Sequence, residues 1–179
     1  MTQKRLEKGL VQVYTGNSKG KSTAAFGLAL RAVGHGYKVY IIQFMKGSTY
    51  YGELVSFKRL EPECKVEHFG LPGWVKKGEA KPEDVAEGKK ALARAEELML
   101  SGEWDIIVLD EINNALWFEL ISLDEVLELL RKKPEHVELV LTGRNAPPEV
   151  VAAAHLVTEM VEIKHPYQVG IGARQGIEY

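Results

Sequence analysis

The stretch "VYTGNSKGKST" at residues 13–23 decides the fold of this chain. A phosphate-binding loop, or P-loop, has the pattern G-x-x-x-x-G-K-[ST], and the residues from Gly20 to Ser22 match its end. Thr15 stands where the first glycine of the pattern is expected, and the nearest glycine is Gly16. The displaced glycine leaves three interpretations open: a defective P-loop, an unrelated glycine-rich turn, or a P-loop altered for unusual chemistry.

The sequence on either side of this stretch favours a P-loop. "LVQVYT" (10–15) reads as a buried strand, and "KSTAAFGLALRAV" (21–33) as the helix that leaves the loop. A turn between a strand and a helix gathers backbone N–H groups around an anion, and the helix N-terminus adds a favourable dipole. Lys21 would then reach phosphate oxygens, and the Ser22 hydroxyl would bind a magnesium ion. The coincidence of strand, G-K-S and helix argues against a turn that binds nothing.

A second nucleotide-binding signal is "DIIVLDE" (105–111), an apolar strand that ends in Asp110 and Glu111. This is the form of a Walker B segment. Open α/β sheets bind ligands at the carboxyl ends of their strands, so we expect these carboxylates beside the P-loop, where one of them would hold Mg²⁺ or its water shell. The alternative is that the acidic residues only solvate the end of a strand. Together the two stretches predict binding of a nucleoside triphosphate with magnesium, but they do not say which bond breaks.

The rest of the chain alternates strands with helices. Further strands are expected at residues 38–45, 64–70, 104–111, 136–143 and 155–163, and helices at 82–102, at 123–133 and from Pro147 onward. Short strands joined by helices imply right-handed crossovers and a mainly parallel sheet. Residues 1–179 are therefore predicted to form a single α/β domain of the P-loop NTPase-like class, with helices flanking the sheet. Residues 46–53 read as a loop, and the wider segment 46–81, which has the weakest periodicity, as a flap or partner surface.

Composition narrows the class of protein. The 179-residue chain is 45% hydrophobic and 27% charged, as an ordinary globular protein is, and its net charge of −2 gives no bulk attraction to nucleic acid or membranes. No apolar run approaches the ~20 residues needed to cross a bilayer, and no signal-peptide core follows the basic start. The lone Cys64 cannot form an internal disulfide, so we expect a cytoplasmic protein in which Cys64 is buried. The five histidines have no metal-ligand spacing.

Five further stretches resemble the ATP:corrinoid adenosyltransferases of the P-loop, cobalamin-pathway type. They lie in the family's order and cover nearly the whole chain. They are "TGNSKGKSTAAFGLALRAVGHG" (15–36), "QFMKG" (43–47) followed by Gly52-Glu53, "VLDEINNAL" (108–116), "LTGRNAP" (141–147) and "KHPYQVGIGARQGIEY" (164–179). The P-loop alone would be a weak marker, whereas this tail together with T-G-N-x-K-G-K is specific. The family's loop carries its glycine where Gly16 stands, so the apparent fault becomes a match.

The resemblance implies a function for each part of the loop. Family members bind ATP with its triphosphate reversed relative to ordinary P-loop enzymes, and a corrinoid in the Co(I) state attacks the 5′-carbon while inorganic triphosphate leaves. Lys21 and Glu111 are the implied catalytic residues, and Glu111 with Ser22, and Asp110 as a further candidate, would hold Mg²⁺. The residues implied to surround the triphosphate are Gly16, Asn17, Ser18, Lys19, Gly20, Lys21, Ser22 and Thr23. Arg144 either reaches the triphosphate from the sheet edge or is a solvated loop arginine.

Two positions depart from the family pattern. Ser18 stands where the family often has glycine, so its side chain would crowd a phosphate or shift the loop. "GLPGW" (70–74) stands where the family commonly has G-F-T-W near its corrinoid, so Trp74 is kept while Pro72 replaces an aromatic residue. The family's aromatic pair is thought to displace the lower ligand of the corrinoid, and Phe69 is a candidate substitute. Trp74 is therefore the corrinoid-binding candidate.

The resemblance also implies partners. They are ATP and a corrinoid, a flavoprotein-type reductase, and a second copy of the chain in a homodimer, with no nucleic acid and no membrane. Two other functions remain open from the residues alone: a small kinase or ATPase that uses the loop in its normal sense, and a nucleotide-dependent switch with segment 46–81 as its partner surface. Trp104 and Trp117 are expected to pack beside the Walker B strand.

Overall fold

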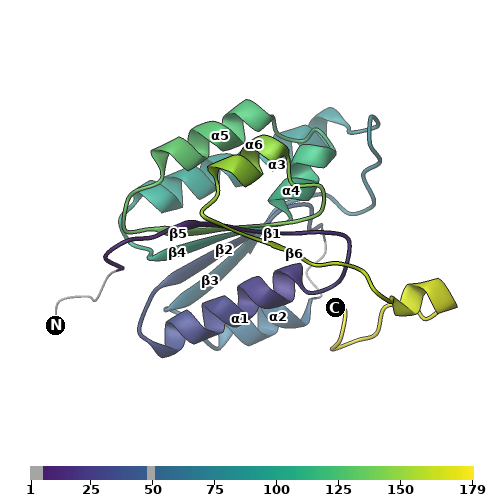
Figure 1. The fold of residues 1–179 in the computed structure, drawn as a ribbon, viewed down its shortest axis with the longest axis horizontal. Helices are drawn as coiled ribbons and strands as arrows, with labels where there is room; N and C mark the ends of the chain where they lie inside the picture. The colour runs from purple at the N-terminus through teal and green to yellow at the C-terminus, as the bar shows by residue number, and fades with distance from the viewer. Residues whose placement is uncertain (1–5, 48–50) are drawn as a thin grey trace.

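The computed structural model describes residues 6–47 and 51–179, and these form one six-stranded sheet between two layers of helices (Figure 1). The strand order is β3-β2-β4-β5-β1-β6, and every neighbouring pair is parallel. The strands are β1 (Val11–Thr15), β2 (Val39–Gln43), β3 (Cys64–His68), β4 (Ile106–Asp110), β5 (Glu138–Thr142) and β6 (Leu156–Glu159). The predicted α/β class with a parallel sheet is therefore confirmed.

Helices cover both faces of the sheet (Figure 1). One face carries α1 (Lys21–Gly34) and α2 (Gly52–Lys58). The opposite face carries α3 (Pro82–Leu100), α4 (Ile112–Trp117), α5 (Leu123–Lys132) and α6 (Pro148–Ala153). After β6 the chain runs out beyond the sheet to a 3₁₀ turn, η1 (Pro166–Val169). No helix within the described residues is both long enough and apolar enough to span a bilayer.

The alternation of side chains along the central strands explains why both faces need cover. On β4, Ile107 and Leu109 join the core cluster under α3 to α6, while Ile106 and Val108 join the cluster under α1. Successive residues of a strand point to opposite faces, so a strand that is apolar at every position must be buried on both sides. β2, β4 and β5 are buried throughout, whereas every residue of the edge strand β6 is exposed.

The expected elements are found, and two short helices were not foreseen. All six strands lie inside the predicted ranges and are shorter at one or both ends, because flanking residues leave the ladder at the sheet edges. α2 begins at Gly52 inside the expected loop 46–53, so that part of the prediction is wrong; residues 48–50 of the same loop lie outside the described part of the chain. α4 was missed because six residues are too few to show a helical period.

The strand order fixes where the two nucleotide-binding signals meet. β1 ends at the P-loop and β4 ends at the acidic pair, and β5 lies between them in the sheet. The P-loop and the acidic pair therefore lie on either side of the carboxyl end of β5, at Thr142, and do not follow adjacent strands.

Candidate functional site

A cavity of about 1140 Å³ opens at the carboxyl edge of the sheet. Its wall is built from the P-loop, the ends of β2 and β4, the segment after β3, the loop after β5 and the C-terminal tail. Ser18 to Thr23 line it, together with Asp110, Glu111 and Arg144. Gly16 and Asn17 do not line it among the described residues. The predicted site residues therefore gather at one edge, with two loop positions set back from the cavity.

Gly16 is required by close packing against the end of β6. Its φ of 96° is unfavourable for any residue with a side chain, and an added Cβ would stand 2.5 Å from the carbonyl oxygen of Met160. The same carbonyl accepts a hydrogen bond of 3.1 Å from the Ser18 backbone N–H. The displaced glycine thus lets the edge strand brace the loop, and it places the Ser18 amide against protein instead of ligand.

Lys21 opens α1 and points back into the loop. Gly20, with φ 124°, precedes the helix and provides no side-chain cap, so the first helical N–H groups are free to meet an anion. The Lys21 residue is 9% exposed, and its ammonium donates a 2.6 Å hydrogen bond to the Ser18 carbonyl. Burial, and then the charge of Arg144, lower the pKa of Lys21, while the charges of Glu111 and Asp110 raise it. An anion at this point would relieve that burial cost.

Asp110 and Glu111 occupy different environments although they are neighbours. Asp110 is 1% exposed, and its oxygens accept hydrogen bonds from Thr142 Oγ1 at 2.7 Å and Gln43 Nε2 at 3.3 Å. The Glu111 carboxylate accepts a bond from Asn114 Nδ2. Burial, and then the charge of Asp110, raise the pKa of Glu111. An ionised Glu111 therefore calls for a cation, and the geometry favours Glu111 over Asp110 as the residue that meets one.

The donors at this edge fit Mg²⁺. The described residues contain no group of three or more His, Cys, Asp or Glu side chains that could hold a metal by themselves. Mg²⁺ is usually held by one or two protein oxygens together with substrate phosphates and water, and Ser22 and Glu111 offer such oxygens on the wall of the cavity. Ser22 and Glu111 would hold such an ion, and the ion would neutralise charge on a bound triphosphate.

Arg144 lies on the cavity wall and is tied to the acidic pair. Its backbone N–H donates a 2.6 Å hydrogen bond to Asn114 Oδ1, and Asn114 also bonds Glu111. Asn114 was not singled out from the sequence. Its position three residues after Glu111 on a helix was the only available signal, and α4 itself was not predicted.

Aromatic and apolar side chains form the other wall of the cavity. Trp74 is 99% exposed at the mouth, on the segment that follows β3. Trp117, at the end of α4, also lines the cavity, and the Lys77 ammonium lies 3.4 Å from its ring centroid. The expectation that Trp117 packs beside the Walker B strand is therefore wrong, whereas Trp104, 5% exposed, does pack in the core. Phe69 and Pro72 line the same wall.

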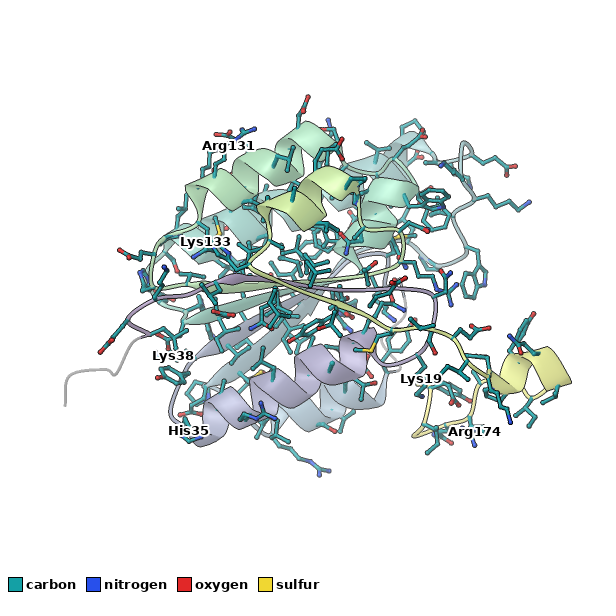
Figure 2. All side chains as sticks on the ribbon, in the orientation of Figure 1. Lys19, His35, Lys38, Arg131, Lys133 and Arg174 are labelled. Carbon is teal, nitrogen blue, oxygen red and sulfur yellow. The ribbon has the colours of Figure 1, made fainter. Side chains whose placement is uncertain are left out.

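The C-terminal tail closes one side of the P-loop. The Lys19 ammonium bonds the carbonyl of Ile177 and lies 3.2 Å from a Glu178 carboxylate oxygen. Glu178 is also paired with Arg174 at 3.0 Å, and hydrogen bonds from Arg174 and Lys19 lower the pKa of Glu178 to about 2. Figure 2 labels Lys19 and Arg174 at the same end of the molecule. The tail therefore brings further charge to the phosphate-binding edge.

Comparisons with known proteins agree with this arrangement. Residues 7–179 match the family model described as ATP:corrinoid adenosyltransferase BtuR/CobO/CobP. A Corrinoid adenosyltransferase of a Sinorhizobium species is 41% identical, covering 100% of this chain and 84% of that protein. Proteins of the same name from Pseudomonas aeruginosa and Escherichia coli K12 are 38% and 33% identical, each over 100% of this chain and over 88% and 90% of their own length. The chain therefore belongs to the ATP:corrinoid adenosyltransferase family.

Proposed function

We propose that this enzyme transfers the 5′-deoxyadenosyl group of ATP to the Co(I) centre of a corrinoid, in the biosynthesis or salvage of adenosylcobalamin. The observation that supports this most is the lining of the cavity at the carboxyl edge of the sheet. A phosphate-binding loop with Lys21 forms one wall, and exposed aromatic side chains such as Trp74 form the other. A polyanion and a large flat macrocycle can thus meet in one space, within a chain of this family.

The reaction requires the protein to position the two substrates and to stabilise charge on the leaving group. The electron pair of Co(I) forms a bond to C5′, the C5′–O bond breaks, and its electrons leave on the triphosphate oxygen. Lys21 and the free N–H groups at the start of α1 would stabilise that developing charge, and Arg144, on the wall of the same cavity, would contribute a second positive charge. No protein nucleophile or general base is required, because cobalt itself attacks the carbon.

Mg²⁺ belongs to this proposal as the cofactor that neutralises charge on the triphosphate. Ser22 and Glu111 are the residues proposed to hold it. Asp110, also a candidate from the sequence, is given a supporting part because its oxygens already accept hydrogen bonds from Thr142 and Gln43.

The segment 46–81 is proposed as the corrinoid-facing surface. It supplies Phe69, Pro72 and Trp74 to the cavity wall, and α2 places Glu53 within 3.2 Å of Gln43 Nε2 beneath it. Trp74 would contact the macrocycle. Phe69 would take the aromatic role that Pro72, as a non-aromatic residue, cannot take.

Three further proposals concern the setting of the enzyme. A flavoprotein-type reductase would supply the electron that makes Co(I), and a second copy of the chain would complete a homodimer. The cytoplasm is the proposed location, supported by the single, unpaired and buried Cys64.

The products of one reaction test the activity. The enzyme is incubated with ATP, Mg²⁺ and chemically reduced cob(I)alamin in the absence of oxygen. Adenosylcobalamin, read from its absorption spectrum, and intact triphosphate, read by anion-exchange chromatography, are expected in equal amounts. Formation of ADP and phosphate without adenosylcobalamin would instead identify a phosphoryl-transfer enzyme, the second function that the P-loop by itself allows.

A further inference from the structure

Thr142 ends β5 at the point where the two nucleotide-binding signals face each other. It is completely buried, and it does not line the cavity among the described residues. Any effect of Thr142 on ligand must therefore pass through the residues that it touches.

One hydroxyl group bonds both members of the acidic pair. Thr142 Oγ1 donates its proton to Asp110 Oδ1 over 2.7 Å and accepts the Glu111 backbone N–H over 2.9 Å. The donor and the acceptor capacity of the hydroxyl are thus both used on consecutive residues of the neighbouring strand end.

The bond to Glu111 holds an unfavourable backbone conformation. Glu111 has φ 67° and ψ 15°, in the left-handed region that is unfavourable for a residue with a side chain. This turn ends β4 and starts α4, and it directs Glu111 towards the cavity. Such a conformation persists only where neighbouring groups enforce it, and the Thr142 hydroxyl is one such group.

The hydrogen bond from Thr142 helps to tie Asp110 to the neighbouring strands. Asp110 receives Thr142 on one oxygen and Gln43 on the other, so strands β2 and β5 hold it from both sides. Glu111 receives only the Asn114 side chain on its carboxylate, among the hydrogen bonds of the described residues.

We propose that Thr142 is a positioning residue that assigns the two acids different tasks: Asp110 anchors the strand ends, and Glu111 is presented to the magnesium–triphosphate. This inference rests on the proposed function, because it concerns the metal-bound form of the same site. Outer groups that orient a metal ligand are commonly worth 10–100-fold in metal affinity.

The test compares Thr142→Val, which keeps the shape but removes the hydroxyl, with Thr142→Ser, which keeps the hydroxyl. Calorimetry measures the affinity for ATP with and without Mg²⁺. Thr142→Val is expected to lose about 10-fold or more of the Mg²⁺-dependent part of the affinity while its affinity for ATP without Mg²⁺ stays near wild type. Thr142→Ser is expected to restore most of the loss. Thr158→Val on the exposed strand β6 controls for the exchange of threonine for valine in a strand.

The outcomes distinguish failure of the proposed function from failure of the positioning role of Thr142. Wild-type protein without any Mg²⁺-dependent affinity for ATP would overturn the proposed function itself. Wild-type affinity that depends on Mg²⁺ and is unchanged in Thr142→Val would overturn the positioning role alone, as would equal losses in the valine and serine variants.

If Thr142→Val does not fold, a second pair of variants tests whether Asp110 and Glu111 have different tasks. Glu111→Gln is expected to lower the affinity for Mg²⁺–ATP at least about 10-fold more than Asp110→Asn does, because only Glu111 would meet the ion. Asp110→Asn is expected instead to lower the melting temperature of the ligand-free protein. Equal losses of Mg²⁺–ATP affinity in the two variants would show that both acids meet the ion and would overturn the division of tasks.

Discussion

At the residue scale, Lys21 shows how the folded chain stores binding free energy for an anion. Lys21 is largely buried as a residue, burial is the first cause of its lowered pKa, and its one hydrogen bond in the described structure goes to the Ser18 carbonyl. A buried cation with so few partners is costly, and a polyanion in the cavity would offset the cost. Glu111 is the opposite case. Burial raises the pKa of its carboxyl group, so its ionised form is costly, and a divalent cation in the cavity would offset that cost.

The first prediction is that Lys21→Ala abolishes turnover. Loss of the ammonium leaves the charge on the departing triphosphate without its nearest cation, and we expect kcat to fall by at least about 100-fold. The adenosylcobalamin assay measures this. Wild-type activity in the variant would remove the loop from the mechanism, and Lys132→Ala, on the exposed end of α5, controls for loss of a lysine elsewhere.

Cys64 carries the second prediction. It is completely buried at the start of β3, and burial raises the pKa of its thiol to about 12. Since the thiolate is the reactive form, the native protein is expected to resist a thiol reagent such as dithionitrobenzoate at pH 8 and to react with one equivalent after unfolding. Rapid reaction of the native protein would contradict the burial of this strand. The expectation from the sequence that Cys64 is a buried apolar residue is confirmed.

At the scale of elements, the P-loop depends on the edge strand β6. The end of β6 accepts the Ser18 amide and packs directly against Gly16, so the loop that binds phosphate is braced by a strand that comes about 140 residues later in the chain. This contact explains physically why the glycine stands one place later than in the common pattern. A side chain at position 16 has no room.

The third prediction compares Gly16, which packs against Met160, with Gly27, which lies inside α1. Gly16→Ala is expected to lower the free energy of unfolding by more than about 1–2 kcal/mol, the cost of the backbone conformation alone, and to weaken ATP binding. Gly27→Ala, on an exposed position of α1 with no heavy atom within 4 Å of the added methyl, is expected to raise stability by about 0.5–1 kcal/mol. Urea unfolding and calorimetry with ATP measure both effects. A harmless Gly16→Ala would contradict the contact with Met160.

At the scale of the whole molecule, the sheet ends in two edge strands, β3 and β6, and β6 is the more exposed. β6 is an edge strand whose residues are all exposed, and the chain beyond it leaves the sheet for η1 before the tail turns back (Figure 1). Val161 is 66% exposed and Ile163 is 89% exposed. Exposed edges and apolar segments of this kind are commonly covered by another chain. This is the surface on which the proposed homodimer would form.

The fourth prediction tests that surface. Light scattering at micromolar concentration is expected to show a dimer for the wild type and a monomer for Val161→Asp/Ile163→Asp, because two charges cannot be buried unpaired in an interface. Leu30→Asp, equally apolar and 59% exposed on α1, is the control and is expected to remain dimeric. A monomeric wild type would overturn the proposed dimer, and a dimeric double variant would place its interface elsewhere.

Much of the fold was predictable because its signals are local. The strands β2, β4 and β5 are apolar at every position, and the strand–loop–helix around Lys21 combines a motif with its context. α2 and α4 were not predictable, since each is too short to show a period; α2 packs beside β3, the next strand in the chain, and α4 packs beside β5. The family and its fold, expected from the order of five stretches, are confirmed.

The class of fold, the family and the proposed phosphate-binding loop could all be predicted from the sequence, because hydrophobic periodicity and a glycine-lysine-serine turn act within a few residues. The contacts of the site residues with one another and with distant segments depend on the tertiary structure. In the folded chain β5 lies between the P-loop and the acidic pair. The Met160 carbonyl accepts the Ser18 amide and packs against Gly16, and Asp110 and Glu111 have different hydrogen-bond partners. These contacts join residues far apart in the chain, and their free energy depends on distance in space, which no local pattern records.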